Sequence, residues 1–276
     1  MSDFNNKFII VGKSGVGKDY ITKIFEDLGK ERLVTYTTRP QRYPGEDTHK
    51  FITEQEAASF ANSEKYLRTS VAQHEYFTTL EDVKKADVII LDPAGVKEIL
   101  SRMPDQTFHL IYINADPAER MRAALLRQDR RFDRACPVLS DKLDYIMHKT
   151  RSSKVVDSYN NAVSEAIETI GKFSKYTSFT DEDKNTLAKE VGIVYSRFVD
   201  EEQAFDDFEH VFYGYVGRRV ETPDNVVFVW DITNNFDPSD IREKVQEIVR
   251  TDEMAKKMCE KNFCGINDKG DGDRGL

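Results

Sequence analysis

Four short apolar runs along the chain have the pattern of buried β-strands. They are residues 7–11 (KFIIV), 86–91 (ADVIIL), 108–113 (FHLIYI) and 226–231 (VVFVWD). A strand with one face in water alternates polar and apolar residues, whereas these runs are almost continuously apolar. We therefore predict that they form a parallel sheet that is covered on both faces.

Helical periodicity follows the runs. After the first, Ile21, Ile24, Phe25 and Leu28 recur at the i, i+3, i+4, i+7 spacing of one helix face, and Gly29 is placed to end the helix. Further helices are predicted over residues 94–103, 117–128 and 238–249, the last two beginning at an Asp-Pro pair. Strands that alternate with helices predict an α/β fold of three layers around a parallel central sheet.

The pattern changes between residues 131 and 197. Apolar residues there follow helical spacing, in one stripe over 155–170 and another over 187–198, and no strand-like run appears. We predict a core made of residues 1–131 and 197–250, interrupted by a helical insertion over 132–196. Residues 251–276 are predicted to be a tail that is disordered at its Gly- and Asp-rich end.

Composition limits the partners. The chain of 276 residues has 40 Lys and Arg against 49 Asp and Glu, a net charge of −9. Acidic residues gather over 181–209, which disfavours a polymeric nucleic acid but leaves room for small anions held by a few basic groups. No apolar run approaches the roughly 20 residues of a membrane span. Three cysteines without metal-ligand spacing fit a reducing compartment, so a cytoplasmic location is expected, and a homodimer is left open.

A glycine-rich loop joins the first predicted strand to its helix. Its residues match G-x-x-x-x-G-K, the phosphate-binding P-loop, and they are Gly12, Lys13, Ser14, Gly15, Val16, Gly17 and Lys18. In this motif the glycines let backbone N–H groups point at phosphate oxygens, and the lysine reaches the β- and γ-phosphates. A turn that only connects strand to helix has no need of Lys18, so we predict an ATP site.

The loop departs from its usual pattern at one position. Asp19 stands where a Ser or Thr hydroxyl normally meets Mg²⁺. A carboxylate can hold the metal directly or through water, but it also brings negative charge toward the β-phosphate. Asp19 is therefore predicted to affect metal binding more than nucleotide binding, and Thr22, one turn later, is a weaker substitute.

A second group of basic and hydroxyl residues lies in residues 35–46 (TYTTRPQRYPGE). Arg39 and Arg42 offer two guanidinium forks suited to a phosphate, although alone they would also fit a basic surface loop. Downstream of a P-loop that reads S-G-V-G-K, the run T-T-R-P-x-R followed by G-E resembles the guanylate kinase family of P-loop nucleoside monophosphate kinases. The resemblance implies that Arg39 and Arg42 bind the phosphate of the monophosphate, with Thr35 in a lesser role, inside a subdomain of about residues 35–80.

The resemblance extends to two further segments. Residues 74–79 (HEYFTT) are similar to the family's N-Y-Y-G-S/T, which places Phe77 at the phosphate-binding tyrosine and Thr79 at the residue that meets the base. Residues 91–97 (LDPAGVK) resemble a shortened L-D-x-D-x-x-G-V-K, so Asp92 would hold Mg²⁺ as a Walker B acid. The alternative for Asp92 is a helix N-cap after the strand.

Base recognition departs from the family. Counting back nine residues from Phe77 gives Arg68 where the family has a guanine-reading Glu. Either Glu64 or Glu75 does that work, or the pocket reads a base other than guanine.

The resemblance also implies a helical lid. Residues 116–131 look like the helix that leads into it and residues 196–205 like the helix that returns, so Arg131 and Arg197 would grip the phosphoryl group in transfer. A solvent-exposed helix position is the alternative for both arginines. Asn234, just after the last predicted strand, would contact adenine, although asparagine there also fits ordinary turn chemistry.

The implied activity is transfer of the γ-phosphoryl group from ATP·Mg²⁺ to a nucleoside monophosphate, with GMP or dGMP first. The alternatives are a kinase of the same fold for another base, such as a thymidylate-like or modified pyrimidine nucleotide, and a binding module without catalysis. An intact P-loop counts against the binding module, and the second phosphate clamp counts against a simple ATPase switch. The insertion and the substitutions suggest a bacteriophage-type member, which would work in the host cytoplasm.

Overall fold

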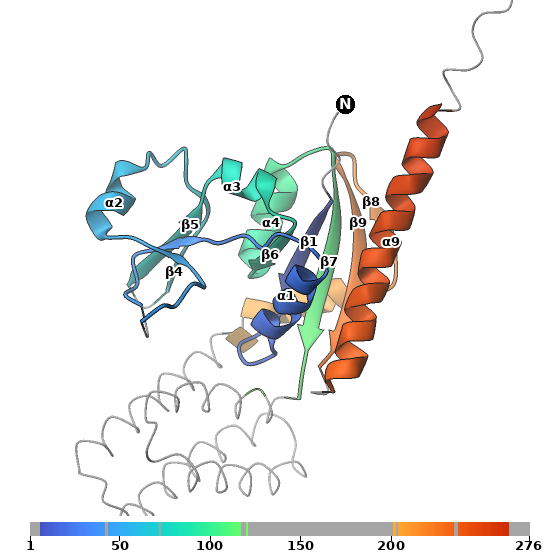
Figure 1. The fold of residues 1–276 in the computed structure, drawn as a ribbon, viewed down its shortest axis with the longest axis horizontal. Helices are drawn as coiled ribbons and strands as arrows, with labels where there is room; N and C mark the ends of the chain where they lie inside the picture. The colour runs from blue at the N-terminus through green and yellow to red at the C-terminus, as the bar shows by residue number, and fades with distance from the viewer. Residues whose placement is uncertain are drawn as a thin grey trace, which may run out of the picture.

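A mostly parallel sheet forms the centre of the molecule (Figure 1). The computed structural model describes residues 6–41, 44–71, 73–116, 120, 201–202, 204–234 and 237–264. Within them the strand order is β6-β1-β7-β9-β8, with β6 Val88–Leu91, β1 Lys7–Val11, β7 Gln106–Asn114, β9 Asn225–Thr233 and β8 Arg219–Glu221. The first four are parallel, and β8 runs antiparallel to β9. The predicted α/β class and the four predicted strands are confirmed, and β8 was not predicted.

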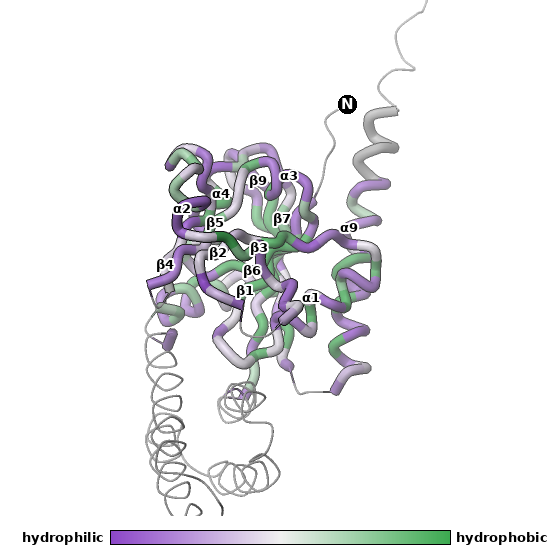
Figure 2. Tube along the Cα trace, turned by 60° about the vertical axis from the view of Figure 1, so that its left-hand side comes forward, coloured by the Kyte–Doolittle hydropathy of each residue, from purple (hydrophilic) through white to green (hydrophobic). Residues whose placement is uncertain are grey.

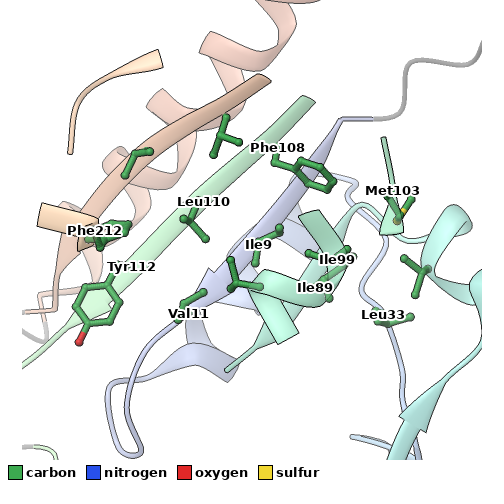
Figure 3. Packing of buried hydrophobic residues seen from close by; sticks show 14 of the residues in the cluster. Ile9, Val11, Leu33, Ile89, Ile99, Met103, Phe108, Leu110, Tyr112 and Phe212 are labelled. Carbon is green, nitrogen blue, oxygen red and sulfur yellow. The ribbon is translucent and has the colours of Figure 1, made fainter. Parts of the chain in front are cut away.

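Helices pack on both faces of this sheet, which explains the continuous apolar runs. On one face α1 (Lys18–Asp27) and α9 (Pro238–Cys264) cover Phe8 and Ile10 of β1. On the other face Ile9 and Val11 pack with α3 (Leu80–Lys85), with α4 (Pro93–Arg102) and with the helical residues 204–213 (Figure 3). Successive side chains of a strand point to opposite faces, so both faces need apolar residues.

Helix α9 is longer than predicted. Its apolar periodicity fades after Val249, but no Gly or Pro follows Pro238 before Gly265, and the helix continues to Cys264. The predicted tail is therefore helical over residues 251–264, while 265–276 lie outside the described residues. No described helix, α9 included, is both long and apolar enough to cross a lipid bilayer. The predicted insertion 132–196 and most of the predicted helix 117–128 also lie outside the described residues.

A second, mixed sheet lies beside the first and carries residues 36–78. Its order is β3-β2-β5-β4, with β3 Lys50–Phe51, β2 Tyr36–Thr37, β5 His74–Thr78 and β4 Tyr66–Val71, and α2 (Glu54–Ser59) connects β3 to β4. Figure 2 shows hydrophobic residues along the central strands and hydrophilic residues over much of α2 and β4. Strands as short as β2 and β3 give no period to detect, so this sheet was not predicted.

Helix α4 ties the second sheet to the first. The Leu67 N–H of β4 donates to Glu98 Oε1 of α4 at 3.2 Å. One turn later on the helix, the Arg102 guanidinium lies 3.6 Å from the centre of the Tyr66 ring and forms an ion pair with Glu98. Leu67 has a φ of 51° where β4 is irregular between Tyr66 and Thr69. This bulge brings the Leu67 backbone to the helix.

A buried polar network joins β7 to α9. His109 Nε2 lies 3.2 Å from Asp252 Oδ1, and Trp230 Nε1 lies 3.1 Å from His109 Nδ1. The indole N–H can only donate, so Nδ1 is the acceptor and the proton sits on Nε2, directed at Asp252. The Asn6 amide also donates to Asp252, and Lys256 lies 3.1 Å from its other oxygen. His109 Nε2, the Asn6 amide and Lys256 thus share a single carboxylate, Asp252, which has no exposed surface.

This network predicts a loss of stability in acid. Burial alone would raise the pKa of Asp252, but hydrogen bonds from His109 and Asn6, with the charge of Lys256, lower it from 3.8 to about 2. A depressed carboxyl pKa stabilises the fold above the unfolded-state pKa, and that contribution disappears as pH falls from about 4 through 2. We expect about 2 kcal/mol of the free energy of unfolding to be lost over this window, measured by urea unfolding at pH 5, 4, 3 and 2. An Asp252→Asn variant with the same pH slope as the wild type would contradict this assignment.

Candidate functional site

The candidate site lies where the parallel strands end. Val11 is paired with Leu91 of β6 and with Tyr112 of β7, and Asn114 is paired with Thr233 of β9. The glycine loop after β1, Asp92 after β6 and Asn234 after β9 therefore leave the sheet at the same edge. Ligands of open parallel α/β sheets bind at this edge.

The glycine loop has the conformation that a phosphate cradle needs. Gly15 and Gly17 have φ values of 81° and 88°, a region that side chains disfavour, and Gly17 caps α1. A Cβ on Gly12 would lie 2.6 Å from the Ile113 carbonyl oxygen, and one on Gly15 would lie 2.2 Å from that of Arg120. Any residue other than glycine at position 12 or 15 would therefore force the backbone to shift. Lys18 folds over the loop, where its Nζ donates to the Gly12 and Lys13 carbonyls at 2.7 and 2.9 Å.

Asn234 lies against this loop. Its side-chain amide donates to the Val16 carbonyl at 2.7 Å, and its backbone N–H donates to Asn114 at 2.7 Å. The residue is buried, and its Nδ2 would lie 2.7 Å from a Cβ added to Gly17. The predicted contact with adenine stays a prediction, and the observed hydrogen bonds of Asn234 support the glycine loop from a distant part of the chain.

Lys13 is turned into the protein. Its ammonium lies 2.7 Å from Glu202 Oε2 and 2.9 Å from Glu209 Oε1, and its side chain is 8% exposed. Glu202 also accepts from Arg120 Nη1 at 3.0 Å. Burial alone would raise the pKa of Glu202, but hydrogen bonds from Lys13 and Arg120 lower it below its ordinary value. Lys13, which was predicted to bind ATP, is thus engaged by two carboxylates.

Ser14 is held by the neighbouring charges. Its backbone N–H donates to Glu201 Oε2 at 2.6 Å, and its hydroxyl donates to the same carboxylate. Arg120 Nε donates to the Ser14 carbonyl at 3.1 Å. We call the charged residues around the loop the P-loop brace, namely Lys13, Arg120, Glu201, Glu202 and Glu209. Of these only Lys13 was a predicted site residue, and Glu201 and Glu202 lie within the predicted returning helix 196–205.

The two carboxylates predicted to hold Mg²⁺ lie at the edge of the sheet that carries the glycine loop. Asp92 caps α4, where its Oδ1 accepts the Gly95 N–H at 2.7 Å, as the alternative interpretation expected. Asp19 lies in the first turn of α1, and the Thr22 hydroxyl is buried and donates to the Lys18 carbonyl at 2.9 Å. Among the described residues no three His, Cys, Asp or Glu side chains converge on a metal-sized site. Mg²⁺ bound to a nucleotide keeps several waters and uses phosphate oxygens, so one carboxylate at this edge would suffice.

Arg39 presents a fixed cation on the second sheet. Its guanidinium makes two hydrogen bonds to the buried Glu46, at 2.8 and 3.3 Å, and lies 5.2 Å from the centre of the Phe51 ring. Burial would lower the pKa of Arg39, but Glu46 and the nearby Tyr76 raise it. A bidentate carboxylate fixes the plane of the guanidinium. Arg42, its predicted partner, lies outside the described residues, as do Arg131 and Arg197.

The aromatic residue on the Arg39 side is Tyr76, not Phe77. Phe77 is fully buried and stacks on Tyr36 with ring centres 5.2 Å apart, so it has no surface for a ligand. Tyr76 pairs with Thr37 and therefore points to the opposite face, where its ring lies 5.4 Å from His49. The resemblance implied that Phe77 binds the phosphate, but the pairing of β5 with β2 puts Tyr76, not Phe77, on the side of Arg39.

The two predicted hydroxyl residues, Thr35 and Thr79, also have different surroundings. Thr35 Oγ1 lies 2.8 Å from His49 Nδ1, on the side of Tyr76. Thr79 caps α3, accepting from the Asp82 N–H and donating to its carboxylate, so its hydroxyl is engaged locally. Thr78, two residues after Tyr76 on the same face, is fully buried, and its Oγ1 has no hydrogen-bond partner. Sequence reasoning missed Tyr76 because only the strand pairing distinguishes the two faces of β5.

The carboxylates considered for base recognition already have partners. Glu75 forms ion pairs with Arg68 at 2.6 Å and with Lys65 at 3.0 Å. Glu64 accepts the Ala61 N–H at 2.8 Å in an exposed turn. Arg68 is therefore part of a charge cluster on the Phe77 face of the second sheet, where Lys65 lies 4.7 Å from the Phe77 ring centre.

Comparison with known proteins gives a fold likeness only. No family model matches the chain, and no curated protein matches its sequence. The crystal structure of guanylate kinase from Anaplasma phagocytophilum is similar over 95% of this chain and 97% of that one, at 11% identity and a TM-score of 0.40. The likeness is loose. It says nothing about activity, which depends on the residues of this chain.

These residues form two candidate anion sites, and Arg39 of the second one is already paired with Glu46. The glycine loop combines backbone N–H groups, the N-terminus of α1 and the Lys18 ammonium at the edge of the central sheet. The second sheet offers Arg39 with the Tyr76 phenol beside it.

Proposed function

We propose that the chain is a nucleoside monophosphate kinase that transfers the γ-phosphoryl group of ATP to a nucleoside or deoxynucleoside monophosphate. The observation that carries the proposal is the pair of anion sites, one on a glycine loop with Lys18 and one on Arg39. A P-loop ATPase has no use for the second site. A binding module without catalysis has no need of Lys18 in the first site.

The chemistry requires positioning more than proton transfer. The acceptor phosphate is already an anion, so no general base is needed. Lys18 and the loop N–H groups would hold the β- and γ-phosphates, while Arg39, with Arg42, would hold the acceptor. Asp19 and Asp92 are the residues that would hold Mg²⁺, which neutralises charge on the phosphates. Arg131 and Arg197 would add positive charge to the phosphoryl group in transfer.

The accepted base has two candidates. The resemblance favours GMP or dGMP. The second candidate is a nucleotide with another base, such as a pyrimidine, because Glu75 is paired with two cations and Glu64 is held in a turn. A guanine edge needs an acceptor that it can reach, and a paired carboxylate is a poor one.

An ADP-release assay tests the proposal. ATP, Mg²⁺ and each common ribo- or deoxyribonucleoside monophosphate would be supplied in turn, and ADP production would be followed through coupled enzymes. We expect at least one monophosphate to raise ADP release well above the rate without acceptor. Turnover of another monophosphate with GMP and dGMP inert would select the second candidate, and no stimulation by any of them would refute the kinase.

The placement of Tyr76 makes a separate prediction. Tyr76→Phe should raise the KM of the acceptor about tenfold, because a hydrogen bond to a charged group is lost, and leave the KM of ATP unchanged. Phe77→Tyr should instead lower the melting temperature, because it adds a hydroxyl to a filled core. Steady-state kinetics and thermal unfolding of both variants check this pair of outcomes, and the reverse pattern would restore Phe77 to the site.

A further inference from the structure

The P-loop brace places a carboxylate on the phosphate loop. Backbone N–H groups of such a loop are its phosphate ligands. Here the Ser14 N–H donates to Glu201 Oε2 at 2.6 Å, and the Ser14 hydroxyl donates to the same carboxylate. A carboxylate with two oxygens that accept from one P-loop residue imitates the contacts of a bound phosphate.

Neighbouring residues hold the contact between Glu201 and Ser14 in place. Arg120 Nη2 lies 3.6 Å from Glu201 Oε2, and its side chain is only 3% exposed. Glu202, the next residue, is held by Lys13 at 2.7 Å and by Arg120 at 3.0 Å. Arg120 in turn donates to the Ser14 carbonyl. The glutamate pair is therefore anchored by two buried cations, and Glu201 is directed at the loop by its neighbours.

We propose that Glu201 is an internal competitor for the phosphate loop, so that a nucleotide must displace its carboxylate from Ser14 in order to bind there. One N–H cannot serve a carboxylate and a phosphate oxygen in the same geometry, and the two anions repel each other. ATP then binds more weakly than it would to an open loop, and the reduction grows with the fraction of molecules in which Glu201 contacts Ser14. That the competing anion is ATP rests on the proposed function. That Glu201 competes at all rests on its contact with Ser14.

Glu201 and Glu202 differ in a way that provides the control. Glu202 contacts the cations of the brace and no loop N–H, whereas Glu201 contacts the Ser14 N–H itself. Removing a competitor tightens binding, and removing a support loosens it. Glu201→Ala and Glu201→Gln should therefore tighten binding, whereas Glu202→Gln should not, although the residues are adjacent.

Isothermal titration of the full chain with ATP·Mg²⁺, and separately with inorganic pyrophosphate, tests the inference. We expect Glu201→Ala to bind both about tenfold more tightly than the wild type, and Glu202→Gln to bind them equally or more weakly. Equal or weaker binding by Glu201→Ala and Glu201→Gln, in variants whose circular dichroism shows them folded, overturns the inference. Tighter pyrophosphate binding in a protein that phosphorylates no monophosphate would support the inference and refute the kinase. Binding of neither probe by any variant would refute both.

Discussion

Replacing Lys18 by alanine is expected to lower kcat/KM of the proposed phosphoryl transfer by about 10³-fold, since Lys18 is the P-loop cation that would hold the β- and γ-phosphates. The Lys18 ammonium already lies over the loop, bonded to two of its carbonyls. The fold should survive, because the side chain contributes nothing to either apolar core cluster. The coupled ADP-release assay measures the effect.

Lys23→Ala is the matched control for this prediction. Lys23 lies on the same helix, and its side chain is 67% exposed with only surface ion pairs to Glu26 and Asp27. Such pairs contribute little, so this variant should keep wild-type kinetics. Full turnover by Lys18→Ala would refute the kinase mechanism, and equal losses in both variants would show that the assay reports damage to α1.

Replacing Asp252 by alanine is expected to lower the free energy of unfolding by about 3 kcal/mol, because it leaves buried donors without an acceptor. His109 Nε2, the Asn6 amide and the Lys256 ammonium all converge on this carboxylate. For a chain of this size the loss corresponds to a melting temperature lower by about 6–12 °C. Differential scanning calorimetry and urea unfolding at pH 7 measure it.

The adjacent Glu253 gives the control for Asp252. It lies on the same turn of α9 but is exposed, so Glu253→Ala should change stability by no more than about 0.5 kcal/mol. If Asp252→Ala were as stable as this control, the hydrogen bonds to His109 and Asn6 would contribute nothing to the fold.

The central sheet was predictable because its strands are buried on both faces, which turns each into an apolar run such as 108–113. The second sheet was not, since β2 and β3 have two residues each and depend on partners distant in sequence. The end of α9 was misplaced because apolar periodicity reports contact with the core, while a helix ends where a breaker occurs. Gly265 is the first residue after Pro238 that provides one.

The glycine loop was predictable because its chemistry lies within seven consecutive residues. The P-loop brace was not, because Lys13 meets Glu202 across 189 positions, and nothing local distinguishes that glutamate from a solvated one. Tyr76 and Phe77 show a third reason why a site residue is hard to predict from the sequence. Adjacent aromatic residues of a strand face opposite ways, so a shift of one position exchanges a core residue for a site residue.

Helix α4 is capped by Asp92, at the edge that carries the glycine loop, and ends at Arg102, whose guanidinium covers Tyr66 of the second sheet. Ten helical residues form a rod about 15 Å long. A rotation of the second sheet that carries Tyr66 and Leu67 with it would therefore turn α4 as a lever, with Asp92 at its far end. Under the proposed function, α4 would therefore link a movement of the second sheet to Asp92, at the edge of the central sheet that carries the glycine loop.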